Sequence, residues 1–204
     1  ENQHHTQRSV QNSEKAGILG SSWSLSQSYI QRDANNSFHN TSNDKFKLVL
    51  EGNSYDLVYS QTDGRYHTKI ETFIFIENKS IAPNAKGAYW IVKTKEGTIY
   101  RFGFYNFSET VANSYNYVWR WNLDLVNDTY GNQIFYNYSE NPYPNDIGAV
   151  YLDKISYNND LKRKINFVYE PNGRPDLRVL YDNGNRISQT RRLKEITISA
   201  NDNL

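Results

Sequence analysis

The feature that most constrains the fold is a strict alternation of apolar and polar residues from Trp119 to Leu125, within segment 118–126. Its apolar members are Trp119, Trp121, Leu123 and Leu125. A period of two residues is typical of a β-strand with one buried face, because successive side chains point to opposite faces of a sheet. The segment therefore predicts a half-buried strand, with Arg120, Asn122 and Asp124 on its polar face.

The alternation stops at a turn-forming cluster and then resumes. Asp128 and Asn132 in this cluster can bond to their own backbone, and Gly131 can adopt the positive φ that a tight turn requires. The second alternating run has an apolar face formed by Ile134, Tyr136 and Tyr138. Together the two runs predict a β-hairpin with an aromatic face.

The same pattern recurs along the rest of the chain. Further strands are expected at residues 23–32, 46–51, 55–59, 66–77, 89–95, 98–104, 150–157, 164–169, 177–181 and 192–199. The run 66–77 is apolar on both sides near its end, which predicts a strand that is covered on both faces. A short helix at Ser108–Ala112 is the only helical alternative. We therefore expect an all-β fold, an extended antiparallel meander of about a dozen strands.

Length and composition limit the classes of protein that fit. We expect residues 1–16, which are polar and aperiodic, to form a flexible arm, and residues 17–204 to form a single β-sheet domain. A net charge of +1 provides no general attraction to nucleic acid or to an anionic membrane. No apolar run is long enough for a membrane-spanning helix. The absence of cysteine excludes disulfides, zinc–thiolate sites and cysteine nucleophiles.

Two constellations could carry chemistry. Asp124, Asp128 and Asn132 could offer oxygen ligands to calcium, but the spacing is not that of an EF-hand loop, so we favour a turn that caps the hairpin and expect no metal or cofactor. Glu96 and Glu109 lie near aromatic residues and could form a glycosidase pair. Carboxylates beside hairpin turns more often serve solubility, so we expect no enzyme.

Six acceptor sequons for N-glycosylation occur in this asparagine-rich chain, at Asn35, Asn40, Asn78, Asn106, Asn127 and Asn137. They fit a glycosylated surface protein. They also fit chance, because asparagine, serine and threonine are all abundant here.

Four segments, taken in order, resemble motifs of Rhs and YD-repeat proteins. They are Gly17-x-x-Gly20-x-x-Trp23-Ser-Leu-Ser with a following Ile30 and Arg32, Trp90 with Gly97-Thr98-x-Tyr100-x-Phe102-Gly103, Trp121-x-Leu123 with Asp128, Gly131, Asn132, Tyr136 and Tyr138, and Tyr181-Asp182-x-Gly184. The last segment places its glycine one position early relative to the family repeat. The nearest likeness is to the amino-terminal shell region of insecticidal toxin-complex B components and related bacterial virulence proteins.

The resemblance implies a sheet that curls into a hollow shell, in a secreted or cell-surface protein. In toxin members the shell encloses a cytotoxic domain, and in the teneurin relatives it belongs to an adhesion protein. The expected partners are the remaining shell of the parent chain or a second copy, with an enclosed toxin domain. The paired Asp-Pro motifs of the family's self-cleaving protease are absent, since Pro175-Asp176 has the reverse order.

We therefore expect a non-catalytic structural segment of such a shell. One alternative is a carbohydrate- or protein-binding β-domain used in adhesion, which an exposed row of Trp or Tyr would favour. A weaker alternative is a glycan-cleaving enzyme, which two facing carboxylates in a cleft would favour. Buried rings together with a smooth polar wall would favour the shell.

Overall fold

The computed structural model describes residues 19, 25–34, 41–112, 115–158, 162–175, 177, 179–182 and 184–200. These residues form an all-β fold with two single-turn 3₁₀ helices, η1 (Thr41–Asn43) and η2 (Asn106–Ser108). No helix in this described part is long and apolar enough to cross a membrane. The strands are β1 (Tyr29–Asp33), β2 (Lys45–Leu50), β3 (Asn53–Ser60), β4 (Arg65–Thr68), β5 (Phe75–Lys79), β6 (Tyr89–Lys93), β7 (Ile99–Phe102), β8 (Glu109–Val111), β9 (Val118–Asn127), β10 (Gln133–Glu140), β11 (Val150–Tyr157), β12 (Arg163–Tyr169), β13 (Leu180–Asp182), β14 (Asn185–Ile187) and β15 (Leu193–Ser199).

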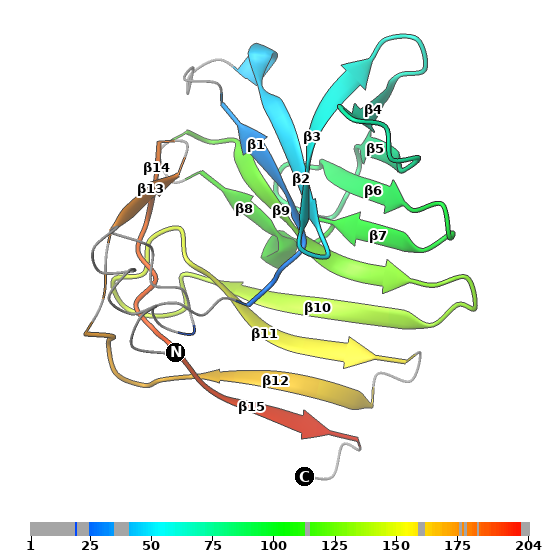
Figure 1. Cartoon of the computed structure of the whole chain (residues 1–204). Helices are drawn as coiled ribbons and strands as arrows, with labels where there is room; N and C mark the ends of the chain where they lie inside the picture. Colours follow the sequence, from blue (N-terminus) through cyan, green and yellow to red (C-terminus); the bar gives the residue numbers. More distant parts are fainter. Residues whose placement is uncertain are drawn as a thin grey trace, which may run out of the picture.

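Eight of these strands close into an antiparallel barrel. Strands β1 to β7 pair in sequence order, β7 pairs with β9, and β9 pairs back with β1 (Figure 1). Closure removes the two free edges that an open sheet of these strands would have. The short strand β8 lies outside this ring and also pairs with β9.

The sheet continues beyond the barrel as a four-stranded ribbon. Strand β10 pairs with β9, and β11, β12 and β15 follow in that order. Figure 1 shows this ribbon running away from the barrel, with β15 along its outer edge. The separate hairpin of β13 and β14 lies beside β1, where the Gln31 amide donates a hydrogen bond of 3.0 Å to Asp182.

The barrel and the ribbon have different apolar cores. Trp90 and Trp121 meet edge to face inside the barrel, with ring centroids 5.7 Å apart. The ribbon buries a second cluster, made up of Tyr138, Ala149, Tyr151, Leu152, Phe167 and Tyr169. Tyr136 packs against both clusters, so the aromatic face of the predicted hairpin links the two cores.

The all-β class and the antiparallel pairing are as the sequence predicts. The expected extended meander is wrong in one respect, because eight of the strands close into a barrel. The expected half-buried strand at 118–126 is also incorrect in one respect, because Asn122 and Asp124 on its polar face are buried. The hairpin turn is confirmed in that Gly131 has a φ of +82°. Gly184, in the turn between β13 and β14, also has a positive φ.

Two local expectations are wrong. The single strand at 66–77 is two strands, β4 and β5, which turn back on each other through the loop 69–74. Phe73 in that loop has a φ of +57°, which ends the extended conformation. The suggested helix at Ser108–Ala112 is instead the end of η2 followed by β8, because its residues find strand partners on β9.

We predict that Trp121→Ala lowers the free energy of unfolding by about 3–5 kcal/mol, because it empties a large volume in the barrel core. Trp121 is 2% exposed, and its indole N–H donates to the Ala88 carbonyl oxygen at 3.1 Å. Urea denaturation measures the change, with Tyr130→Ala in the exposed β9–β10 turn as the matched control. A loss below about 1 kcal/mol for Trp121→Ala would show that the ring does not hold the barrel core.

Gly103 and Gly131 allow backbone strain to be separated from steric overlap. Both have positive φ, but a Cβ at Gly103 would lie 2.1 Å from Cδ1 of Trp121, whereas one at Gly131 meets nothing within 4 Å. Urea denaturation should give a cost of about 1–2 kcal/mol for Gly131→Ala and a clearly larger cost for Gly103→Ala. Equal losses of unfolding free energy for Gly103→Ala and Gly131→Ala would contradict the role of the Trp121 contact. In the β9–β10 turn, Gly131→Val should lower the free energy of unfolding more than Thr129→Val does, because only Gly131 has a positive φ.

Candidate functional site at the junction of barrel and ribbon

Strand β9 is the element at which the barrel and the ribbon separate. Its first half pairs with β8 and β1, and its second half pairs with β7 and β10. The N–H of Leu123 donates to Ser28 at 3.1 Å, and its carbonyl accepts the Tyr138 hydroxyl at 2.8 Å. The N–H and C=O of one residue point to the same edge of a strand, so β1 and β10 share this edge. Tyr138 therefore fills the gap between the start of β1 and Phe135, the last residue of β10 that pairs with β9.

A buried ion pair lies under the other face of β9. The Arg101 Nε donates to Asp124 Oδ1 at 2.6 Å, and the same carboxylate accepts the Phe104 N–H and the Ser108 hydroxyl at 2.6 and 2.8 Å. Burial raises the pKa of Asp124, while the charge and hydrogen bond of Arg101 oppose the shift. Because both carboxylate oxygens are occupied, Asp124 fixes the chain around η2 against β9.

A second buried cation closes the barrel. The Arg32 Nε donates to the Val118 carbonyl at 2.7 Å, and its Nη1 pairs with Asp44 at 2.5 Å. The guanidinium also lies 5.2 Å from the centroid of Phe46 and 5.5 Å from that of Trp121. Arg32 thus joins the end of β1 to the start of β9 from within an aromatic setting, which suits a planar and weakly hydrated cation.

Glu109 is a buried carboxyl group at the edge of the junction. Its Oε1 accepts the Lys86 N–H at 3.2 Å, and its Oε2 has no hydrogen-bond partner among the described residues. Burial raises the pKa of Glu109 against the opposing backbone hydrogen bonds. The neighbouring Glu140 is exposed, so Glu109 is the better-defined buried carboxyl group.

The structure separates the residues of the calcium alternative. Asp124 is engaged with Arg101, whereas Asp128 accepts hydrogen bonds from the backbone N–H of Tyr130 and of Asn132 at 2.8 and 2.9 Å. Those bonds form the turn that the sequence predicts. Within the described ranges, no group of three or more His, Asp or Glu side chains is arranged to hold a metal ion.

The structure also separates the two carboxylates of the glycosidase alternative. Glu96 is exposed in the β6–β7 turn beside Lys95, next to the end of β9 that pairs with Ile99. Glu109 pairs with Trp121, six residues earlier on β9. At the usual rise of a strand this spacing is about 20 Å, which is too long for two carboxylates that act on one glycosidic bond.

The other motif residues serve different parts of the fold. Trp90 is fully buried, and Gly97 adopts a φ of +90° in the turn before β7. Tyr181 is exposed on the β13–β14 hairpin, next to Asp182. Gly17, Gly20 and Trp23 lie outside the described residues.

The sequons differ in accessibility. Asn78 and Asn106 are exposed, whereas Asn127 and Asn137 are half-buried within or at the end of strands. Asn35 and Asn40 lie outside the described residues. Glycosylation stays a prediction for all six.

The sequence pattern does not predict the bonds from Arg101 and Ser108 to Asp124, or the contact between Lys86 and Glu109. The sequence signal for these bonds is the pair of polar residues Asn122 and Asp124, which alternate with large apolar side chains in one strand. Such residues need partners if the second face of the strand is covered.

The described geometry is shared with regions of bacterial toxins. No family model and no curated protein matches the chain at the sequence level. Among solved structures, the N-terminal domain of effector protein SpvB from Salmonella typhimurium strain LT2 aligns with a TM-score of 0.70 at 17% identity, over 90% of this chain and 78% of that one. The TcdB2-TccC3 structure aligns with a TM-score of 0.69 at 14% identity, over 90% of this chain.

The Tc holotoxin pore of Photorhabdus luminescens aligns with a TM-score of 0.67 at 14% identity, over 89% of this chain. The chain spans only 12% of the TcdB2-TccC3 chain and 11% of the holotoxin chain. At these identities the likeness defines the fold, an all-β architecture found within larger toxin chains. The resemblance to Rhs and YD-repeat proteins is not confirmed at the sequence level.

We predict that Glu109 makes the stability of the chain depend on pH. Its folded-state pKa lies above the ordinary value of 4.5, so its contribution is fully present below that pH and is lost as the pH rises through the folded-state pKa. The free energy of unfolding of the parent chain, relative to that of Glu109→Gln, should therefore be highest below pH 4.5 and should fall as the pH is raised from there. Urea unfolding at a series of pH values measures the free energy of unfolding of both proteins. Curves that stay parallel for the parent chain and Glu109→Gln would contradict the prediction. Glu96→Gln, at an exposed position, is the control.

Proposed function

We propose that this chain is a non-catalytic structural segment of a secreted or cell-surface Rhs/YD-repeat-type protein. In this role it forms part of a β-shell that encloses or presents a toxin or adhesion domain. The observation that carries the proposal is the construction of the ribbon. One of its faces is apolar and the other is mainly polar, and the apolar face becomes exposed at the last strand, β15.

The apolar face of the ribbon is covered near the barrel and uncovered at β15. Phe167 on β12 is 9% exposed, while its cross-strand partner Ile196 on β15 is 48% exposed and Ile198, two residues on, is 71% exposed. Exposed isoleucines that continue a core face are costly in water, because apolar surface favours burial. A further layer or strand packed against β15 would bury them.

The opposite face of the ribbon is mainly polar. On this face Lys154, Asn166 and Thr197 are cross-strand neighbours on β11, β12 and β15. A second row holds Lys164 and Ser199 together with Ser156, which is buried. This arrangement matches what a shell needs, since one face joins the body of the protein and the other meets solvent or a polar cargo.

The edge of β15 supports the same proposal. Among the described strands β15 pairs only with β12, so the backbone groups on its outer edge have no strand partner. The likeness to small parts of much longer toxin chains supports a role as one section of a larger assembly. The proposed occupant of this edge is a strand from the remaining shell of the parent chain or from a second copy.

The adhesion alternative has less support in the distribution of aromatic residues. Trp90, Trp119 and Trp121 are all buried, so the described residues contain no exposed row of tryptophans. The exposed tyrosines Tyr59, Tyr130 and Tyr181 lie on β3, in the β9–β10 turn and on β13, so they form no row either. The enzyme alternative loses its candidate pair, as Glu96 and Glu109 lie in different parts of the fold.

We predict that the isolated chain associates through β15 in the micromolar range, and that the double substitution Ile196→Lys and Ile198→Lys keeps it monomeric. The added charges would oppose strand pairing and burial of this face. Sedimentation velocity measures the association, with Val58→Lys on the barrel strand β3 as the control, because Val58 has a similar exposure. A compact monomer at all concentrations, with slow amide exchange in residues 192–199, would contradict the shell proposal.

A further inference from the structure

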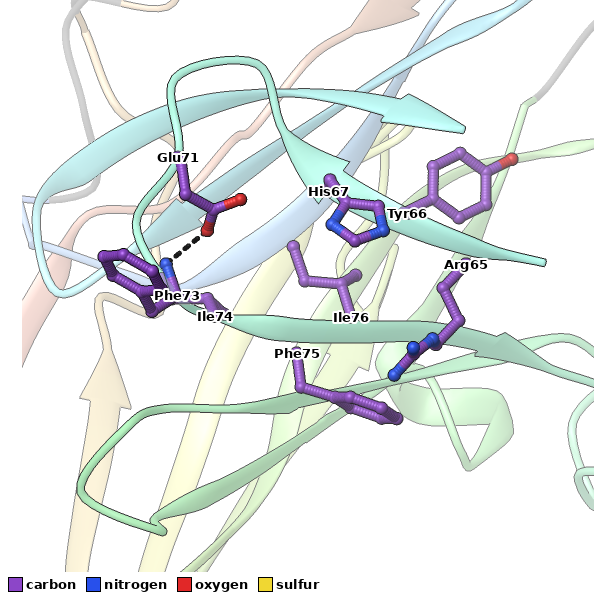
Figure 2. A pocket seen from close by; sticks show the side chains of 8 residues that line it. All are labelled: Arg65, Tyr66, His67, Glu71, Phe73, Ile74, Phe75 and Ile76. Carbon is purple, nitrogen blue, oxygen red and sulfur yellow. Dashed lines mark hydrogen bonds between the residues drawn. The ribbon is translucent and has the colours of Figure 1, made fainter. Parts of the chain in front are cut away.

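A cleft opens on the barrel surface where the ladder between β4 and β5 is interrupted. The two strands share a single pair, Tyr66 with Ile76, and the loop 69–74 then leaves the sheet. The resulting cleft has a volume of about 320 Å³. Figure 2 shows the side chains that surround it, namely Arg65, Tyr66, His67, Glu71, Phe73, Ile74, Phe75 and Ile76.

One wall of the cleft is held in a strained conformation. Phe73 has a φ of +57°, and its ring is 77% exposed. The Glu71 Oε1 accepts the Phe73 N–H at 2.5 Å and thereby fixes the backbone, as the dashed line in Figure 2 indicates. A bulky residue in the left-handed region costs energy, and so does an exposed ring. The fold therefore keeps the Phe73 ring exposed to solvent although both the backbone strain and the exposed apolar surface are unfavourable.

The floor of the cleft is apolar and its rim is polar. Ile74 and Ile76 lie at its base, while Phe75 contacts the Arg65 guanidinium, which lies 4.7 Å from the ring centroid. Arg65 also pairs with Asp63 at 2.9 Å, and Asp63 lies 3.0 Å from the His67 ring nitrogen. With Glu71 also present, the rim offers hydrogen-bond donors and acceptors, and its one guanidinium is already balanced by Asp63.

These features exclude several classes of ligand. A phosphate or carboxylate would meet an arginine already neutralised by Asp63 and would be repelled by Glu71. A cation would find Arg65 already on the face of Phe75. A wholly apolar ligand would strip water from the polar rim without replacing its hydrogen bonds.

We propose that this cleft binds the ring of a neutral saccharide. A sugar ring presents C–H groups on one face, which can pack on Phe73, and hydroxyl groups around its edge, which can bond to Glu71, His67 and Arg65. An apolar surface with a few convergent polar groups is the usual construction of a small-ligand site, and the volume lies at the lower end of such sites. The binding is separate from the shell role and does not depend on it.

Saturation-transfer NMR on the whole chain tests the site, with the methyl glycosides of glucose, galactose, mannose and N-acetylglucosamine as probes. We expect transfer to at least one of them, at least a tenfold loss of affinity in Phe73→Ala, and retained binding in Phe73→Trp, which keeps an aromatic face. Glu71→Gln keeps an acceptor for the Phe73 N–H but removes the charge, and it should weaken binding less than Phe73→Ala does.

Ile81→Ala is the matched control, because Ile81 is 92% exposed and has a φ of +72° in another loop. Its affinity for the sugar should equal that of the parent chain. The proposal is overturned if none of the four glycosides receives transfer, or if Phe73→Ala binds as tightly as the parent chain while its melting curve shows a folded protein. Binding of an apolar dye at this cleft, lost in Phe73→Ala, without sugar binding would also overturn it.

Discussion

The architecture depends on how β9 satisfies the hydrogen bonds of its two edges. A buried strand must pair nearly all its N–H and C=O groups, and β9 does so with four strands and one tyrosine hydroxyl. On one edge β1 gives way to β10 at Leu123, and the Tyr138 hydroxyl occupies the interval. This replacement lets one sheet close into a barrel and also continue as a ribbon without leaving a buried carbonyl unpaired.

The barrel core covers one face of β9 and the chain around η2 covers the other, which determines the chemistry around this strand. Trp121 fills the barrel on one side, whereas Asn122 and Asp124 are buried on the other. Buried polar groups are costly unless they are bonded, so Arg101, Ser108 and Thr110 are required partners. Replacing such a network by apolar side chains can be neutral for stability, so its contribution here is better described as fixing one arrangement of η2 against β9.

The sequence predicts local features of this fold better than long-range ones. Alternation gives β9 and β10 their strand character, and Gly131 gives their turn, because both signals depend only on neighbouring residues. Alternation identifies a face but not a partner, so the pairing of β1 with β9 and the closure of the barrel could not be derived from it. The same limit explains the failure at 66–77, where Phe73 belongs to a loop although it continues an apolar run. It also explains why Asp124 was placed in solvent.

Two exposed apolar regions of the described chain, one on β15 and one at Phe73, have different physical origins. Ile196 and Ile198 lie on a regular strand and continue a core face, so a neighbouring strand could cover them without any change in the backbone of β15. Phe73 lies on a strained loop, braced by Glu71, and no continuation of the sheet would bury it. The first pattern is what an interrupted sheet requires, whereas the second keeps a ring accessible at a cost in strain. The two regions therefore support two separate roles, one in assembly and one in ligand binding.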